Sequence, residues 1–216
     1  DGHVFHRTRG LHGFGFAVCL RCGRAESEHE PDGPGHLPLS LQDHHRLRGG
    51  RDADGKTRCA GNDEAWAIKR RVWLGAEVFT DVFELQLVHP NSALPIPDKT
   101  TAYSISVALR EALSRRLGVD AREIGCAASL SMSEQGTPTY SVCLYDAAAG
   151  GAGYVAHAAS ALPELLASAR QILSCSKECD GACHNCLLSF DTEHQADILD
   201  RNAALQFLTE EVLQAL

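Results

Sequence analysis

Four cysteines within twelve residues constrain this chain more than any other feature of its sequence. They lie in the run Cys175-Ser-Lys-Glu-Cys179-Asp-Gly-Ala-Cys183-His-Asn-Cys186. Thiolates so close in sequence can surround one ion with little loss of loop entropy, and four sulfurs in a tetrahedron are a common structural zinc site. Gly181 permits the turn between the two halves. We therefore expect structural zinc here; an iron–sulfur cluster, disulfides and free thiols are the alternatives.

The use of cysteine predicts the redox environment. The chain has 216 residues and nine cysteines, and its first ten residues are polar rather than signal-like. An odd number of cysteines in a chain of this size favours metal binding by reduced thiols over a disulfide framework. We therefore expect a cytoplasmic protein. No apolar run approaches the roughly 18 residues of a membrane span, so no membrane partner is expected. The missing initiator methionine indicates a fragment of a longer protein.

A second metal site is expected in residues 1–65, which are rich in Gly, His, Pro and Arg. Such a segment buries too little apolar surface to fix its own fold, so a metal is needed to order it. Cys19-Leu-Arg-Cys22 has the spacing of half a zinc site, and Cys59 offers a third thiol. The fourth ligand is expected to be a histidine, and we favour His45. The other candidates are His29, His36 and His44. Reduced thiols in a flexible arm are the alternative.

From residue 66 the pattern changes to that of a mixed α/β domain. Alternating apolar residues at 83–87 predict a half-buried strand, and runs at 124–132 and 139–145 predict two more. A helical stripe is expected to start at a cap on Thr100 or Thr101 and to end at Gly118. We therefore expect a central sheet with packed helices at 66–216, joined to a loop-rich, zinc-ordered arm at 1–65.

Two further helices are expected near the carboxyl end. One occupies 162–173 and has Pro163 in its first turn, where proline is tolerated. The other begins at a cap on Asp200 and continues through Leu216. The four-cysteine run lies between them, so its metal ion is expected to fix the end of one helix to the start of the next.

A glycine-rich loop, Gly150-Gly151-Ala-Gly153-Tyr, follows Asp146 at the end of a predicted strand. Exposed amides at the start of a helix can hold a phosphate. The spacing matches neither a P-loop nor a dinucleotide fingerprint, however. Glycine is also favoured where a strand and a helix pack closely. We therefore favour a structural role for the loop, with phosphate binding as the alternative and Asp146 as a cap or a ligand contact.

The charge of the chain argues against a self-sufficient DNA-binding domain. Its net charge is −8 with neutral histidines, whereas phosphate neutralisation usually requires a basic excess. Two basic stretches remain, and solvated surface charge is their simpler explanation. Nucleic acid stays a candidate partner if another domain or subunit supplies most of the charge. The residues that we would then expect to contact DNA or a helicase are Arg46, Arg48, Arg51, Lys69, Arg70 and Arg71.

No convincing catalytic set is present in the sequence. Neither a Ser/His/Asp order, nor paired acids, nor a His-Glu-x-x-His motif stands out. There is no P-loop, so the chain carries no ATPase motor of that type. The pair His44 and His45 leaves a metal-dependent nuclease as an alternative. We expect no catalytic residue in this chain.

Taken in order, these motifs resemble those of the MrfA-like zinc-binding (MZB) domain. The motifs are the amino-terminal knuckle (Cys19-Leu-Arg-Cys22-Gly23), the segments 45–50, 59–61 and 80–81, the loop 145–154, the four-cysteine run and Asp200-Arg201. That family occurs at the carboxyl end of superfamily-two DNA helicases and in separate partners of such helicases. The knuckle favours the DrmB-like branch found in DISARM anti-phage systems. The resemblance implies zinc ligation by the four cysteines, and it does not imply a catalytic activity for the domain itself.

These observations together predict a non-catalytic zinc-binding module with one or two Zn²⁺ ions per chain. The module is expected to connect a DNA helicase domain or subunit to its DNA or its partner, in phage defence or DNA repair. A metal-dependent nuclease and an iron–sulfur module for DNA processing are the alternatives.

Overall fold

The structure is a computed structural model that describes residues 2–29, 36–47, 55, 57–133 and 136–215. The chain forms two compact units: unit 1 contains Asp1–Val4 and Val78–Leu216, and unit 2 contains Phe5–Glu77. None of the helices in the described part of the chain combines the length and the apolar character needed to cross a bilayer. The fold is mixed α/β, as expected.

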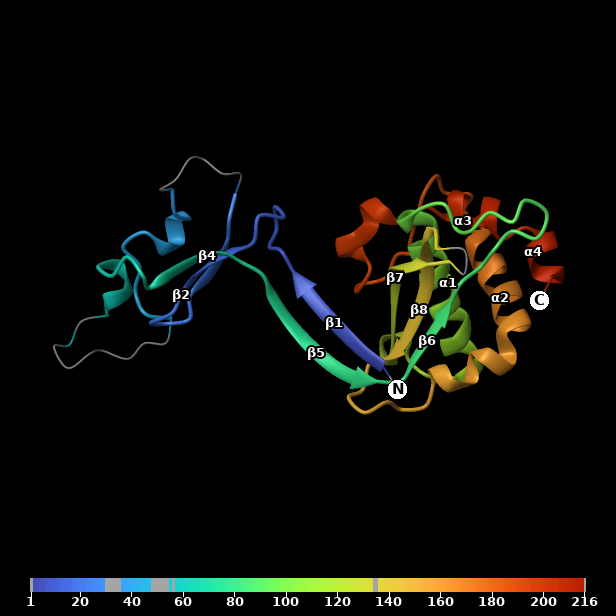
Figure 1. The fold of residues 1–216 in the computed structure, drawn as a ribbon, viewed down its shortest axis with the longest axis horizontal. Coiled ribbons are helices and arrows are strands. Elements are labelled where there is room, and N and C mark those ends of the chain that lie inside the picture. The colour runs from blue at the N-terminus through green and yellow to red at the C-terminus, as the bar shows by residue number, and fades with distance from the viewer. Residues whose placement is uncertain (1, 30–35, 48–54, 56, 134–135, 216) are drawn as a thin grey trace. The chain divides into compact units, whose positions relative to one another are not determined.

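Unit 1 is built on a three-stranded antiparallel sheet in the order β6-β8-β7 (Figure 1). The strands are β6 (Val82–Leu85), β7 (Ile124–Met132) and β8 (Pro138–Asp146). The central strand β8 carries buried residues on both faces, which explains its continuous apolar pattern. Gly125 lies opposite Tyr145 in this sheet, and a Cβ atom on Gly125 would lie 2.1 Å from the tyrosine ring.

The core of unit 1 is centred on helix α1 (Lys99–Leu117), which packs against β7, β8 and two further helices. The helix ends at Gly118 with φ of 69°, as expected of a glycine C-cap. The expected cap at Thr100 or Thr101 is wrong. Asp98 is the cap, because its carboxylate accepts the backbone N–H of Thr101 at 2.8 Å.

The remaining helices of unit 1 are α2 (Leu162–Leu173), α3 (Arg201–Phe207) and α4 (Glu210–Gln214). The single helix expected from Asp200 to Leu216 is therefore interrupted. Leu208 has φ of −80° and ψ of 66°, which is not helical, and Thr209 then starts α4. Short 3₁₀ turns lie at η3 (Ala121–Glu123), η4 (Val155–His157), η5 (Ala159–Ala161) and η6 (Glu193–Ile198).

Unit 2 has little regular structure and a small core. Its three-stranded sheet has the order β3-β2-β4, with β2 (Phe16–Cys19), β3 (Ala25–Ser27) and β4 (Ile68–Val72). Strands β1 (Gly2–Thr8) and β5 (Leu74–Thr80) form a separate two-stranded ladder. The 3₁₀ turns are η1 (Leu39–Leu41) and η2 (Ala60–Asn62). The buried apolar cluster consists of Ala17, Cys19, Leu41 and Cys59. Two of these four residues are cysteines, so a metal ion bound to them would also stabilise the small core of unit 2.

Candidate metal centres

The carboxy-terminal cluster begins immediately after α2 and brings Cys175, Cys179, Cys183 and Cys186 together. The backbone turns sharply there, because Cys175 and Glu178 both have positive φ, 39° and 50°. Residues with a Cβ atom rarely adopt this conformation, and such strain persists only where surrounding interactions fix it. A bound ion held by four ligands would provide that fixation.

The distances between the sulfur atoms fit one tetrahedral ion. The Sγ atom of Cys175 lies 3.6 Å from that of Cys183 and 3.8 Å from that of Cys179. The Sγ atom of Cys186 lies 3.7 Å from that of Cys179 and 3.8 Å from that of Cys183. A tetrahedron with Zn–S bonds of about 2.3 Å has edges of about 3.8 Å.

The same spacing bears on the alternatives. A disulfide would bring two sulfurs to about 2.05 Å, and all nine cysteines are free. In an iron–sulfur cluster of several irons, the four thiolates are divided among different iron atoms, so they cannot all lie as close together as around a single ion, whereas these four sulfurs all lie within 4.8 Å of one another. The geometry therefore fits four ligands on one zinc ion, with no position left for a substrate.

Backbone amides stabilise the thiolate form at one edge of this cluster. The N–H groups of Lys177 and Cys179 lower the pKa of Cys175 to about 6, against the opposing effect of burial. Burial raises the pKa of Cys186 to about 12. The N–H of Cys183 also points at the Cys186 sulfur, at 3.3 Å. Cys175 is therefore ready to bind as a thiolate near neutral pH, whereas Cys186 needs the charge of the metal ion.

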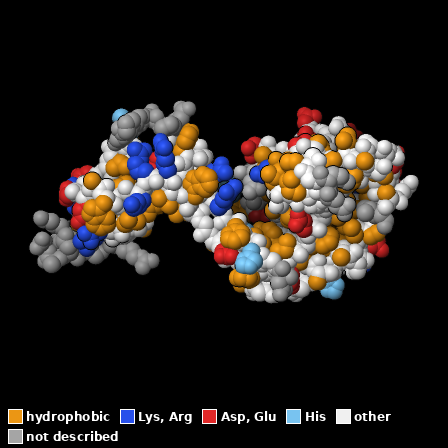
Figure 2. All heavy atoms as spheres, viewed as in Figure 1, with side chains coloured by type: hydrophobic (Ala, Val, Ile, Leu, Met, Phe, Trp, Pro, Cys, Tyr) orange, Lys and Arg blue, Asp and Glu red, His pale blue; other side chains and the backbone are white. Residues whose placement is uncertain are grey.

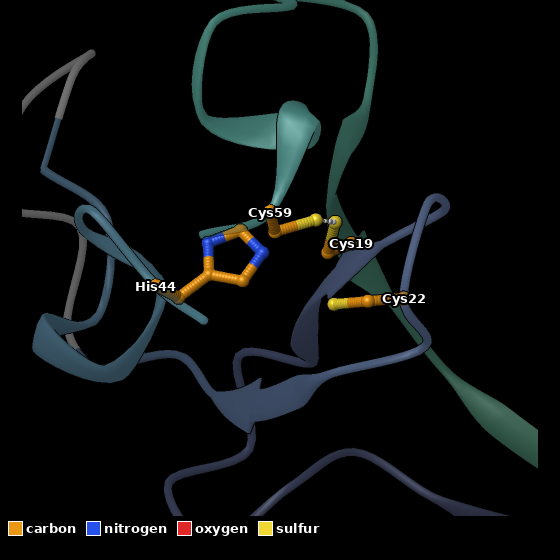
Figure 3. Close-up of side chains that lie close together, drawn as sticks. All are labelled: Cys19, Cys22, His44 and Cys59. Carbon is orange, nitrogen blue, oxygen red and sulfur yellow. Dashed lines mark hydrogen bonds between the residues drawn. The ribbon is translucent and has the colours of Figure 1, made fainter. Parts of the chain in front are cut away.

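The amino-terminal cluster lies in unit 2 and contains Cys19, Cys22, His44 and Cys59 (Figure 3). Its ligand atoms all lie within 4.8 Å of one another. Cys19 ends β2, Cys22 follows in the turn, and Cys59 precedes η2. The Cys19 and Cys59 sulfurs are 3.8 Å apart, again one edge of a zinc tetrahedron.

The orientation of His44 completes the tetrahedral set. Its Nδ1 atom lies 3.2 Å from the carbonyl oxygen of Leu41, which can only accept, so Nδ1 carries the proton. The Nε2 atom is then a free acceptor, and it is buried without a hydrogen-bond partner among the described residues. A buried acceptor without a partner is costly. Zinc would satisfy it, and a ligating histidine typically donates its other N–H to a carbonyl in this way.

His45 does not join this cluster, so the expectation that it supplies the fourth position is corrected to His44. The imidazole of His45 is exposed and forms a hydrogen bond with the Thr57 hydroxyl, with Nδ1 2.9 Å from Oγ1. Neighbouring residues in an extended segment point to opposite sides. Since His44 is only 4% exposed and points inward, His45 points outward.

Asn62 holds the cluster together and was not anticipated from the sequence. Its Nδ2 group donates to the carbonyl oxygens of His44 and Cys59, both at 2.8 Å. Its Oδ1 atom accepts the N–H of His44 at 2.9 Å. One side chain thus fixes both segments that carry these ligands. The only available signal was its position three residues after Cys59.

The glycine-rich loop is closed by Asp146 itself. This carboxylate is fully buried and accepts the backbone N–H groups of Ala152, Tyr154 and Val155, at 2.6, 3.1 and 3.0 Å. These amides are the donors that a phosphate would use. A side chain on Gly151 would lie 2.3 Å from the Asp81 carboxylate. The arrangement of Asp146, Gly150, Gly151 and Gly153 thus favours the structural role.

The structure describes four of the six basic residues that were expected to contact DNA or a helicase. Arg48 and Arg51 lie outside the described residues. Arg70 donates to the buried carboxylate of Glu28, at 3.1 Å, and so is partly neutralised. Lys69 and Arg71 are exposed on β4. Arg46 lines a shallow pocket at the amino-terminal cluster, and the other residues lining that pocket are Arg21, Cys22, Cys59 and Ala60.

Comparison with known proteins agrees with a zinc-binding domain. Residues 105–187 match the family described as MZB, the MrfA Zn-binding domain. The chain is also 29% identical over 211 residues to the Druantia protein DruE of Escherichia coli (strain UMEA 4076-1). That match covers 90% of this chain and 10% of the relative, so the chain spans about a tenth of that protein's length.

Two solved structures show a weaker likeness. They are crystal structures of the DUF1998 helicase MrfA bound to DNA, and bound to DNA and AMPPNP. Each has a TM-score of 0.44 and 16% identity, and covers 65% of this chain. The match covers 18% of the first and 17% of the second MrfA chain. All four cysteines of the carboxy-terminal cluster lie within the segment that matches the MZB family, and zinc is the cofactor that both clusters and this family support.

Proposed function

We propose that the chain is a non-catalytic zinc-binding module that acts with a DNA helicase domain or subunit, in phage defence or DNA repair. The observation that carries this proposal is the closed tetrahedron of four sulfurs inside the segment that matches the MZB family. Four protein ligands leave no open position on the ion, so the zinc stabilises a surface rather than reacting. We also propose a cytoplasmic location, where free thiols such as these persist.

The proposed partnership with a helicase rests on the family resemblance and on the names of the similar proteins. The matched family is named for MrfA, and MrfA is described as a DUF1998 helicase bound to DNA. The DISARM branch is a finer proposal that rests on the amino-terminal knuckle alone. The curated relative is a Druantia protein, and it shares 29% of its residues with this chain over the aligned length.

Among the residues that the structure describes, the geometry of both clusters disfavours the nuclease and the iron–sulfur alternatives. His44 faces three cysteines, so a metal held there has four protein ligands and no site for the attacking water that a nuclease needs. The sulfur spacing of the other cluster fits one ion rather than several. We also propose that the chain divides by function into an arm at 1–65 and a zinc-binding domain at 66–216.

The test uses the chain together with the DNA helicase domain or subunit proposed as its partner, both purified without added metal. Elemental analysis should give two zinc ions per chain, with no visible absorption. The double variant Cys183→Ser, Cys186→Ser should lose one zinc and should lose DNA unwinding or binding to the helicase. Exposed Ser160→Ala is the matched control and should keep all of these. Unchanged unwinding and binding in the double variant would contradict the proposal, and iron in the protein would contradict the zinc assignment.

A further inference from the structure

Positive charge is concentrated in unit 2. Residues 5–77 contain twelve of the chain's 20 Lys and Arg residues but only ten of its 28 Asp and Glu residues. Unit 2 therefore has a small positive charge although the chain as a whole carries −8. Figure 2 shows Lys and Arg side chains interleaved with hydrophobic ones over the part of the molecule that carries β2 and β4. Such a mixture of cations and apolar side chains is typical of surfaces that bind single-stranded nucleic acid.

One exposed tryptophan on this unit is flanked by two arginines. Trp73 lies just before β5 and remains 50% exposed. The guanidinium carbon of Arg9 lies 4.5 Å from the centre of the Trp73 ring, and that of Arg7 lies 5.5 Å from it. Residues 7 and 9 are two apart, so in an extended chain they point to the same side. Within the described part of the chain, neither arginine has a carboxylate partner.

The second tryptophan provides a contrast. Trp66 is 56% exposed and also lies near an arginine, with the Arg21 carbon 4.9 Å from its ring centre. The Arg21 guanidinium, however, donates two hydrogen bonds of 2.8 Å to the Glu64 carboxylate. Its charge is therefore already neutralised. Of the two tryptophans, Trp73 is therefore the one whose exposed ring lies beside arginines with no carboxylate partner among the described residues.

We infer that Trp73, Arg7 and Arg9 form a binding site for single-stranded DNA, in which an unpaired base stacks on the indole and the arginines bind the flanking phosphates. The inference deepens the proposed function and rests on it, because it names the form of DNA that this unit holds. A duplex hides the faces of its bases, so the indole selects unpaired strands. Phe5 lies two residues before Arg7 in β1, is 69% exposed, and extends the same side with a second aromatic ring.

The test exploits the fact that the chain has two tryptophans. The variant Trp66→Phe leaves Trp73 as the only indole, and Trp73→Phe leaves Trp66. Each zinc-loaded variant is titrated with oligo(dT) while its tryptophan fluorescence is recorded. We expect oligo(dT) to quench Trp66→Phe strongly, because the base stacks on Trp73, and to leave Trp73→Phe nearly unquenched.

Affinity provides the second measurement. Trp73→Ala should weaken oligo(dT) binding about 5- to 150-fold, the range expected when a stacking aromatic side chain is removed, whereas Trp66→Ala should not. Arg7→Gln with Arg9→Gln should reduce the slope of log K against log salt by about 0.7 for each lost phosphate contact. A duplex of equal length should bind more weakly than oligo(dT).

Three results would overturn the inference: unchanged affinity in Trp73→Ala, quenching of Trp66 instead of Trp73, or tighter binding of the duplex or of an RNA strand than of oligo(dT). The zinc content of each variant shows that it has folded. If the variants bind oligo(dT) unchanged while the chain still holds two zinc ions and still supports its helicase, the proposed function stands, and only the single-stranded DNA site at Trp73 is rejected.

Discussion

Arg201 donates a hydrogen bond from its Nε group to the backbone carbonyl of Cys179. Its Nη1 group donates to the carbonyl of Leu173 at 3.3 Å, and its backbone N–H donates to Gly181 at 2.8 Å. One buried side chain therefore links the last turn of α2, the middle of the cysteine cluster and the start of α3. These contacts orient the cluster from outside its four ligands, as the outer partners of a metal site do.

Removal of the Arg201 donors should loosen the carboxy-terminal metal. We expect Arg201→Met to weaken zinc binding at this site by about 10- to 100-fold, the usual cost of losing an outer partner. Competition with a chromophoric chelator measures the affinity. Arg115→Met, on the exposed side of α1, is the control and should leave the affinity unchanged. Equal zinc affinities in the two variants would mean that Arg201 does not contribute to the geometry of the cysteine cluster.

The adjacent histidines offer a matched pair for the amino-terminal site. Elemental analysis of His44→Ala should give one zinc per chain, because Nε2 of His44 is the atom that faces the three sulfurs. His45→Ala should retain two, because its ring contacts Thr57 instead. Zinc loss from the His45 variant with full retention in the His44 variant would reverse the assignment.

Asp146→Asn should destabilise unit 1. An amide in place of the carboxylate turns an N–H₂ group toward backbone N–H groups that now donate to Asp146. An unsatisfied buried group costs about 1–3 kcal/mol, which corresponds to a fall of roughly 2–4 °C in Tm for each kcal/mol in a domain of this size. Thermal unfolding measures the change, with exposed Asp197→Asn as the control. An unchanged Tm would show that other contacts order the loop.

The pair formed by Arg110 and Asp191 should make stability depend on pH. Burial raises the pKa of the Asp191 carboxyl, but hydrogen bonds from Ser189 and Arg110 outweigh burial and lower it. A lowered pKa stabilises the fold above the unfolded value of about 3.9, and this contribution is lost as pH falls through the folded pKa.

Asp191→Asn should therefore be less stable than the parent chain by about 1–3 kcal/mol at pH 7, because Arg110 stays buried without its carboxylate. The difference should remain constant from pH 8 to pH 5 and shrink below pH 4. Urea unfolding of both proteins at each pH measures it, and loss of zinc at low pH affects both alike. A difference that grows as the pH falls would contradict this explanation.

The sequence predicted the sites best where the ligands are close together in the chain. The run from Cys175 to Cys186 needs no distant partner, so its spacing alone identified the site. The choice between His44 and His45 depends instead on which side of an extended segment faces inward. Leu41 and Asn62 determine that side through hydrogen bonds, and Asn62 lies 18 residues from His44. No local pattern contains this information.

In the fold, too, the features set by local sequence patterns were predicted and those set by long-range contacts were not. The sheet of unit 1 and helix α1 follow from periodicity within each segment. The break at Leu208 does not, because the amphipathic pattern continues through it and tertiary packing of two short helices prevails. The contact between Arg9 and Trp73 could not be predicted from the sequence either, because the pairing of β1 with β5 brings these distant residues together.

The ladder of β1 and β5 has a consequence for how the chain can be divided. The polypeptide leaves unit 1 after Val4 and returns to it at Val78, on two hydrogen-bonded strands. Unit 2 is thus an insertion between two parts of unit 1, and it is connected to unit 1 by two chain segments rather than by one. A truncation that starts at residue 66 would remove all of β1, whereas an excision of 5–77 closed by a short turn would keep the ends of both strands that belong to unit 1, Gly2–Val4 and Val78–Thr80. Separation of the two units therefore requires the chain to be cut at two positions, after Val4 and before Val78.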